Sequence, residues 1–164
     1  MIQFIHDSDR ESFENALRFG QRQIRRLVET HPDFYPMYTS EGKWKHDGPA
    51  WTHWCDGFLP GLMWLFYRHL GPEHPDARFW MENAVRYSKP LESRKADSDV
   101  HDLGFIFFSA FYRWYQVTRD KSIRDIVLHA GKTLAQRFNE EGQYLRSFVT
   151  EDSVFIDSMM NVGL

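Results

Sequence analysis

The stretch Asp56-Gly-Phe-Leu-Pro-Gly-Leu-Met-Trp-Leu-Phe-Tyr67 decides the fold, because as a helix it is apolar on every side. A helix at a protein surface keeps a polar face, whereas a helix that is apolar all round is stable only when other elements surround it. The stretch therefore predicts a buried helix that begins shortly after Asp56.

The same apolar pattern returns at two later places, and an aspartate precedes it each time. Asp102 precedes the apolar segment Leu103 to Val117, and Asp157 precedes Ser-Met-Met-Asn-Val-Gly-Leu. The three aspartates are 46 and 55 residues apart, intervals that suit a repeated pair of helices. The sequence therefore predicts a series of helical hairpins, with each apolar helix starting next to an aspartate.

Amphipathic segments alternate with these apolar ones. Pro75 to Tyr87 and Ile123 to Phe138 carry apolar residues at helical spacing, and so does a helix predicted to start at the capping box Ser8-Asp9-Arg10-Glu11. Residues 34–50, rich in glycine, proline and aromatics, predict an irregular segment or a short hairpin. Alternating amphipathic and apolar helices form two concentric layers, so we expect an all-α fold, a segment of an α/α toroid, in a single domain over residues 1–164.

The aspartates that precede the apolar helices should gather at one end of the ring, where helix N-termini favour carboxylates. Each could simply cap its helix, a role that contributes about 1 kcal/mol and no chemistry. The same end, however, should also collect side chains that stack on sugar rings and hydrogen-bond to them. These are Trp44, Trp51, His53, Trp54 and His101. The combination predicts a carbohydrate site.

Composition argues against several other functions. The formal net charge is -3, so no basic excess is available to neutralise phosphates, and we expect no nucleic-acid partner. The longest apolar run is shorter than the roughly 20 residues that cross a bilayer, and the first ten residues lack a secretion signal, so we expect no membrane span and a cytoplasmic protein. The histidines show no helical metal-ligand spacing, and neither a metal nor another cofactor is expected.

Three motifs carry a family resemblance. They are Trp-Cys-Asp-Gly-Phe-Leu-Pro-Gly at 54–61, His-Asp-Leu-Gly-Phe at 101–105 and Ile-Asp-Ser-Met-Met-Asn at 156–161. From about Phe34 to the last residue, and in this order, the chain resembles the N-terminal half of the unsaturated glucuronyl hydrolases, glycoside hydrolase family 88. The resemblance implies an (α/α)6 barrel of six helical hairpins, about half of which this chain would supply.

The resemblance also implies a reaction. Such enzymes remove the 4,5-unsaturated uronic acid from the non-reducing end of oligosaccharides made by polysaccharide lyases, and they do so by hydrating a vinyl ether. It implies that Asp157 is the general acid and base, and that Asp102 is a second carboxylate that also contacts sugar hydroxyls. His101 would help to orient the site, and Trp54 would pack on the unsaturated ring.

Two alternatives stay open. An unsaturated rhamnogalacturonyl hydrolase would share the barrel and the chemistry but act on pectin fragments. Alternatively, the chain could be a truncated, catalytically silent helical domain that keeps only a sugar-binding surface. Half a ring also leaves inner-helix surfaces uncovered, so we expect self-association, or a complementing C-terminal half, to cover Met159, Met160 and Leu164.

Overall fold

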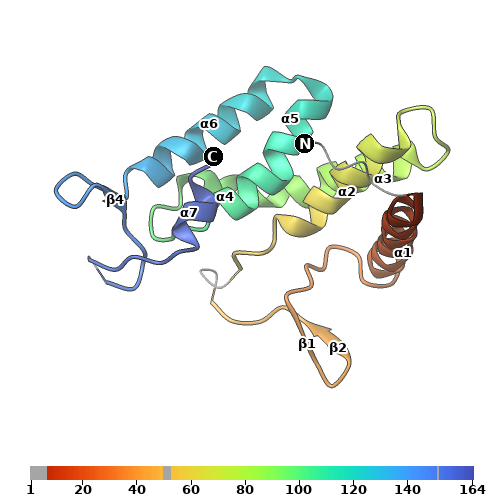
Figure 1. The fold of residues 1–164 in the computed structure, drawn as a ribbon, viewed down its shortest axis with the longest axis horizontal. Coiled ribbons are helices and arrows are strands. Elements are labelled where there is room, and N and C mark those ends of the chain that lie inside the picture. The colour runs from red at the N-terminus through yellow and green to blue at the C-terminus, as the bar shows by residue number, and fades with distance from the viewer. Residues whose placement is uncertain (1–6, 50–52, 151) are drawn as a thin grey trace. The chain divides into compact units, whose positions relative to one another are not determined.

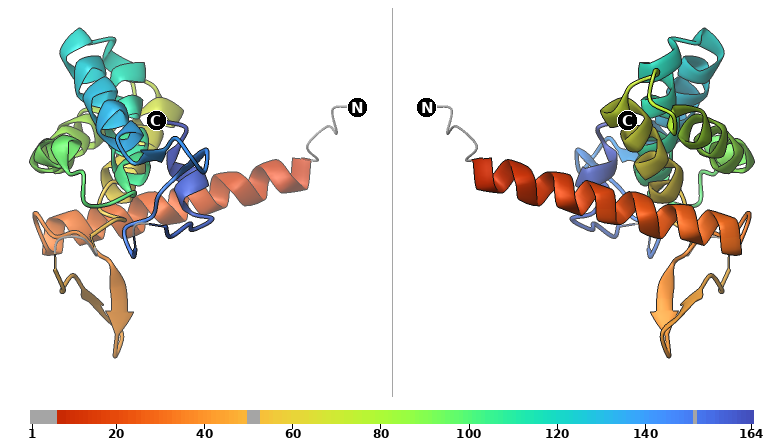
Figure 2. Two further views of the ribbon diagram at one scale, coloured as in Figure 1. Left: turned by 90° about the vertical axis from the view of Figure 1, so that its left-hand side faces the viewer. Right: turned by 90° about the vertical axis from the view of Figure 1, so that its right-hand side faces the viewer.

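The computed structural model describes residues 7–49, 53–150 and 152–164, and the chain divides into two compact units between Phe34 and Tyr35. The first unit contains α1, Asp7–Thr30, which Figure 2 shows as one unbroken helix. Ser8 lies in its first turn rather than at its cap, so the helix begins slightly earlier than the capping box predicts. Among the described residues, no helix has the length and apolar character needed to span a membrane.

The second unit, Tyr35–Leu164, opens with the hairpin that the sequence allows. Strands β1, Tyr38–Ser40, and β2, Lys43–Lys45, pair antiparallel with Tyr38 opposite Lys45. Between them Glu41 and Gly42 both have positive φ, as a tight two-residue hairpin turn requires. This hairpin lies immediately before the first apolar helix and becomes relevant to the site below.

The first helical pair consists of α2, Phe58–Leu70, and α3, Ala77–Ser88. The chain leaves α2 through Gly71, whose φ of 83° is a conformation that few residues other than glycine adopt. The face of α3 that packs inward is the predicted one, comprising Ala77, Trp80, Ala84 and Tyr87. A 3₁₀ segment, η2, Lys89–Ala96, follows α3.

The second pair begins with a helix of three parts: α4, Leu103–Ile106, the π-helical η3, Phe107–Tyr112, and α5, Arg113–Thr118. Arg119 adopts the left-handed conformation and ends it. The outer helix α6, Lys121–Ala135, then runs back beside it (Figure 1), and the two enclose the main apolar core. That core includes Leu103, Ile106, Phe107, Ala110, Phe111, Ile123, Val127, Ala130 and Leu134.

The chain after α6 differs from the expectation. The outer helix ends at Ala135, and Phe138 instead pairs with Leu145 in a second small hairpin, β3, Phe138–Asn139, with β4, Tyr144–Leu145. The third apolar helix, α7, Ser158–Asn161, starts where the sequence predicts. The fold class is confirmed: inner and outer helices alternate, and strands are confined to two short hairpins among the described residues.

Candidate active site

The inner helices start side by side at one end of the second unit. Near the start of α4, a Cβ added to Gly104 would lie 2.5 Å from the Cα of Asn161, so only glycine lets α7 approach so closely. Gly57 makes the same contact between the start of α2 and Ile106, again at 2.5 Å. Asp56, Asp102 and Asp157 are therefore brought to the same end of the inner layer, as the sequence repeat predicts.

The carboxylates of this end are not helix caps. Asp102 and Asp157 stand at the N-cap positions of α4 and α7, but neither side chain accepts a capping hydrogen bond. A contrasting case is Asp120, whose side chain accepts from the backbone N–H of Ser122 at 2.8 Å and caps α6. Capping therefore accounts for Asp120, whereas the other two carboxyl groups are free to make tertiary contacts.

Those contacts converge on His101. Its Nε2 lies 3.2 Å from Asp157 Oδ2 and 3.4 Å from Asp102 Oδ1, so one imidazole bridges the two carboxyl groups. The ring is 1% exposed and stacks on Phe148 with a centroid separation of 4.8 Å, which fixes its plane. Nε2 is therefore the ring nitrogen that faces both carboxyl groups.

Asp102 lies in the more buried half of this cluster. Burial raises the pKa of the Asp102 carboxyl, and the charge of Asp157 raises it further, while His101 opposes the shift. Asp157 is more accessible, because its side chain is 46% exposed. The site thus combines a buried carboxyl that tends to keep its proton with a second carboxyl that a substrate can reach.

Asn161 connects the starts of α4 and α7, and sequence reasoning gave it no role. Its side-chain Nδ2 donates to the carbonyl of Asp157 at 3.1 Å, while its Oδ1 accepts from the backbone N–H of Phe105 at 2.9 Å. Asn161 is fully buried, so these bonds replace all its contact with water. Its position four residues after Asp157, on the same helical face, is a signal that could have identified it.

The aromatic side of the site is built around Trp54. Its indole is 41% exposed and its ring lies 5.5 Å from that of Phe105 and 5.9 Å from that of Phe58. Phe105 belongs to the turn that starts with Asp102, so this aromatic surface adjoins the carboxyl groups. An exposed indole supported by other rings is suited to stacking on a sugar. Trp44, on β2, is also exposed, whereas Trp51 falls outside the described residues.

A second cluster of titratable side chains precedes α2. His46 Nε2 lies 2.9 Å from Asp56 Oδ1, and the His46 ring packs against that of His53 with centroids 4.0 Å apart and planes inclined by 36°. Nearby, burial raises the pKa of the Cys55 thiol, with Asp56 adding to the shift, which disfavours the reactive thiolate. By spacing alone, both this cluster and the His101–Asp102–Asp157 cluster could hold a metal ion, since the ligand atoms of each lie within 4.8 Å of one another.

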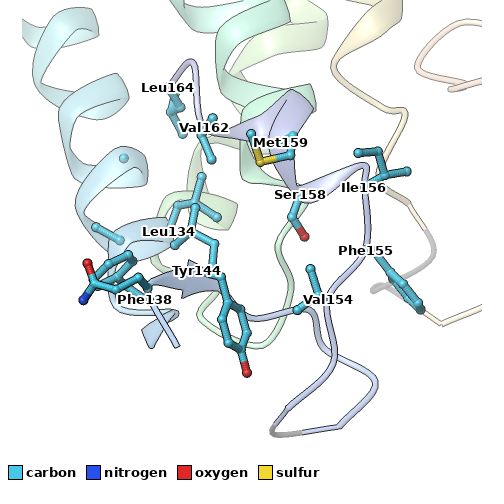
Figure 3. Close-up of a pocket in the computed structure, with 14 residues that line it drawn as sticks. Leu134, Phe138, Tyr144, Val154, Phe155, Ile156, Ser158, Met159, Val162 and Leu164 are labelled. Carbon is cyan, nitrogen blue, oxygen red and sulfur yellow. The ribbon is translucent and has the colours of Figure 1, made fainter. Parts of the chain in front are cut away.

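An apolar groove of about 720 Å³ lies beside α7 (Figure 3). It is formed by the end of α6, the second hairpin, the segment before α7, and α7 itself. Its lining includes Leu134, Phe138, Val154, Phe155, Ile156, Met159, Val162 and Leu164. None of the bridged carboxyl groups lines it, so the groove suits packing against protein better than binding a polar sugar.

Comparisons with known proteins find similar sequences and similar folds. No family model matches the chain. The unsaturated glucuronyl hydrolase of Bacillus sp. strain GL1 is 26% identical over 164 residues, which cover 94% of this chain and 41% of that protein. A solved unsaturated glucuronyl hydrolase specific for heparin is 28% identical with a TM-score of 0.71, covering 85% of this chain and 37% of that one.

A further solved structure is similar in fold but less similar in sequence. The crystal structure of the Streptococcus agalactiae unsaturated glucuronyl hydrolase superposes with a TM-score of 0.74 at 19% identity, covering 98% of this chain and 43% of its own. The chain thus spans about two fifths of the length of the Bacillus and Streptococcus agalactiae relatives. In sequence and in fold, it is a relative of the unsaturated glucuronyl hydrolases and corresponds to part of their α/α barrel.

Proposed function

We propose that the full-length protein carrying this chain removes a 4,5-unsaturated uronic acid from the non-reducing end of lyase-generated oligosaccharides. The observation that carries the proposal is the bridge of His101 between Asp102 and Asp157, beside the exposed indole of Trp54. The names of the relatives point to the same substrate class, since they are unsaturated glucuronyl hydrolases.

The proposed reaction begins at Asp157. Its carboxyl group donates a proton to C4 of the C4=C5 bond, and the resulting carboxylate takes a proton from the water whose oxygen adds to C5. The product is a hemiketal, which opens and releases the rest of the oligosaccharide. Among the two carboxyl groups, Asp157 is assigned this role because its side chain is 46% exposed and accessible to a substrate.

Asp102 and His101 support that proton transfer in different ways. The raised pKa of Asp102 favours a proton held within the cluster, because the low-dielectric site and the nearby charge of Asp157 disfavour a second negative charge. His101 fixes the positions of both carboxyl groups, because its Nε2 contacts each of them. Trp54 would stack on the unsaturated ring and hold C4 against Asp157.

The residues that complete the site and the barrel are part of the proposal. This chain covers 41% of the Bacillus relative, and its α7 region exposes apolar side chains, with Ile156 at 86% and Met160 at 73%. Patches of this kind on soluble proteins are normally covered. We infer that further helical hairpins, or a second copy, cover the groove beside α7. Location in the cytoplasm stays a prediction.

The test is a turnover assay with the full-length protein, following the loss of absorbance of the substrate double bond. Unsaturated chondroitin and hyaluronan disaccharides should be consumed, whereas a pectin-derived unsaturated rhamnogalacturonan disaccharide should be a poorer substrate. Preference for the pectin fragment would favour the rhamnogalacturonyl alternative. No turnover of any of them by a folded, full-length protein would contradict the proposed reaction.

A further inference from the structure

The cluster before α2 joins two segments of the chain, and its outermost members, His46 and Asp56, are ten positions apart. His46 directly follows β2, whereas His53 and Asp56 belong to the turns that lead into α2. Asp56 is buried, and the nearest imidazole atom, His46 Nε2, lies 2.9 Å from its Oδ1. The cluster therefore fixes the end of the first hairpin against the start of the first inner helix.

Its contents differ from those of the proposed catalytic cluster. Two imidazoles stand with one carboxylate, where the catalytic cluster has one imidazole and two carboxylates. The two ring centroids lie only 4.0 Å apart, with the ring planes inclined by 36°. Neutral imidazole is the form that binds metal ions.

The hydrogen bonds leave His53 incompletely satisfied. His53 Nε2 is buried and has no hydrogen-bond partner among the residues that the structure describes. A buried nitrogen without a partner is uncommon, and an ion is one of the groups that can account for it. A proton on His46 Nε2 can form the hydrogen bond to Asp56 Oδ1, but it provides no partner for His53 Nε2.

We propose that His46, His53 and Asp56 bind a divalent transition metal, with Zn²⁺ as the best match. Two imidazoles and one carboxylate form a known zinc ligand set, which leaves a fourth position for water. Imidazole donors disfavour Ca²⁺ and Mg²⁺, which take oxygen ligands.

The spacing fits with a modest closure. Ligand atoms about 2.0–2.1 Å from a tetrahedral zinc are about 3.3 Å apart. The His46 Nε2 to Asp56 Oδ1 distance of 2.9 Å is close to this value, and all three ligand atoms lie within 4.8 Å of one another. On binding, the metal coordinates His46 Nε2, and the single proton of the neutral imidazole moves through solvent from Nε2 to Nδ1.

The ion would act as a clamp next to Trp54. It would tie the first hairpin to the turn from which this indole projects, and so hold the aromatic side of the sugar site in place. The proposal does not rest on the proposed reaction, because the clamp consists of residues outside the bridged carboxyl cluster.

The experiment is a calorimetric titration of Zn²⁺ into the chelator-treated protein. We expect one Zn²⁺ per chain, with affinity lowered more than roughly 100-fold by His53→Ala, beyond the 10–100-fold typical of losing an outer-shell partner. His46→Gln should lower it similarly, and it preserves the fold because the amide can still donate to Asp56. The melting temperature should rise with Zn²⁺ in the wild type and not in either variant.

His101→Gln is the matched control, since it alters the other cluster with metal-ligand spacing. It should bind Zn²⁺ as tightly as the wild type. Unchanged binding in both His53→Ala and His46→Gln would overturn the proposal, and so would loss of binding in His101→Gln alone, which would place the ion at the catalytic cluster. Absence of binding by the wild type would overturn it as well.

Discussion

The starts of the first and second inner helices occupy equivalent positions in the repeat yet differ in what surrounds their aspartates. Asp56 and Asp102 are both buried, and each has an imidazole close to its carboxyl oxygen. At Asp56 the imidazoles outnumber the carboxylates, whereas at Asp102 a second carboxyl group from the start of α7 joins the same imidazole. In the two proposals made above, the same repeat position serves a cation site at Asp56 and a proton-transfer site at Asp102, and the third side chain makes the difference.

The largest expected effect distinguishes a catalytic role of Asp157 from a helix-capping role. In the full-length protein, Asp157→Asn should lower turnover of the unsaturated disaccharide by on the order of 10² to 10⁴, because an amide can neither deliver a proton to C4 nor take one from water. Folding should be nearly unchanged, since the swap conserves size. Steady-state kinetics and circular dichroism measure the two properties.

The matched control is Asp120→Asn, at a genuine cap. Asparagine caps a helix about as well as aspartate, so stability should change by only a few tenths of a kcal/mol and turnover should not change. Near-normal turnover in Asp157→Asn would remove Asp157 from the mechanism. An equal loss in both variants would mean that helix stability, rather than proton transfer, limits the rate.

The next effect tests the close approach of the inner helices. Gly57→Ala and Gly104→Ala each place a Cβ 2.5 Å from a backbone atom of the neighbouring helix, so each should lower the free energy of unfolding by about 1–3 kcal/mol. Turnover by the folded protein should fall further in Gly104→Ala, because its neighbour is the helix that starts with Asp157. Denaturant unfolding and kinetics at equal folded concentration give the comparison.

Gly163→Ala serves as the control for these variants, since nothing lies within 4 Å of a Cβ at that position. Its stability should stay within about 0.5 kcal/mol of the wild type, as is usual for uncrowded surface changes. If Gly57→Ala and Gly104→Ala were equally harmless, the packing of α2, α4 and α7 described above would be wrong.

Asn161→Ala should have a smaller effect on structure than on the rate. It removes one of two acceptors of the Phe105 N–H, which also donates to the Asp102 carbonyl, and one of two donors to the Asp157 carbonyl, which also accepts from the Met160 N–H. Each lost bond should therefore cost about 0.5–1.5 kcal/mol. As a positioning residue, Asn161 should influence kcat more than KM. Asn83→Ala removes a comparable side-chain bond, to the Phe79 carbonyl within α3, and should leave both constants unchanged.

The smallest effect concerns pH and the buried carboxyl of Asp102. Burial raises its pKa in the folded state, so its contribution to stability is fully present below the unfolded pKa of about 3.9 and is lost as pH rises through the folded pKa. Asparagine does not titrate, so the Asp102→Asn variant loses no such contribution as pH rises. The melting temperature of the variant minus that of the wild type should therefore become more positive from acid to neutral pH.

Asp120 should behave in the opposite sense. Hydrogen bonds from Ser122 lower the pKa of its carboxyl, so its contribution is present above the unfolded pKa and is lost as pH falls through the folded pKa. The melting-temperature difference for Asp120→Asn should thus become less negative as the solution is acidified. Parallel pH profiles for the two variants would contradict the contrast between a buried cluster and an exposed cap.

Periodicity predicted much of this fold, because burial on one helical face leaves a direct trace in the sequence. The inward face of α3 and the apolar character of α2 follow from it. Phe138 was assigned to the wrong element, since an apolar residue three positions past a helix end fits the helical pattern and a hairpin equally well. Local spacing does not distinguish these two outcomes.

The candidate site was harder to predict from the sequence than the fold. Motif resemblance predicts roles for Asp102, Asp157 and His101, and these roles stay predictions. The geometry that joins the three residues depends on contacts across 56 residues, which the motifs do not show. The cluster of His46, His53 and Asp56 escaped a search for helical ligand spacing, because its members come from a hairpin and a turn. Such groupings become visible only when tertiary packing brings distant segments together.

The π-helical segment η3 makes the second inner helix unusually tolerant of a change in length. Each π turn holds one residue more than an α turn. Deletion of the exposed Phe108 would let the segment relax into an ordinary α-helix, with the starts of α4 and α6 still in place. The same deletion within α6 would rotate its whole apolar face away from the core. The loss of one residue can therefore be absorbed in the middle of this helix, between its start beside Asp102 and its end at Arg119.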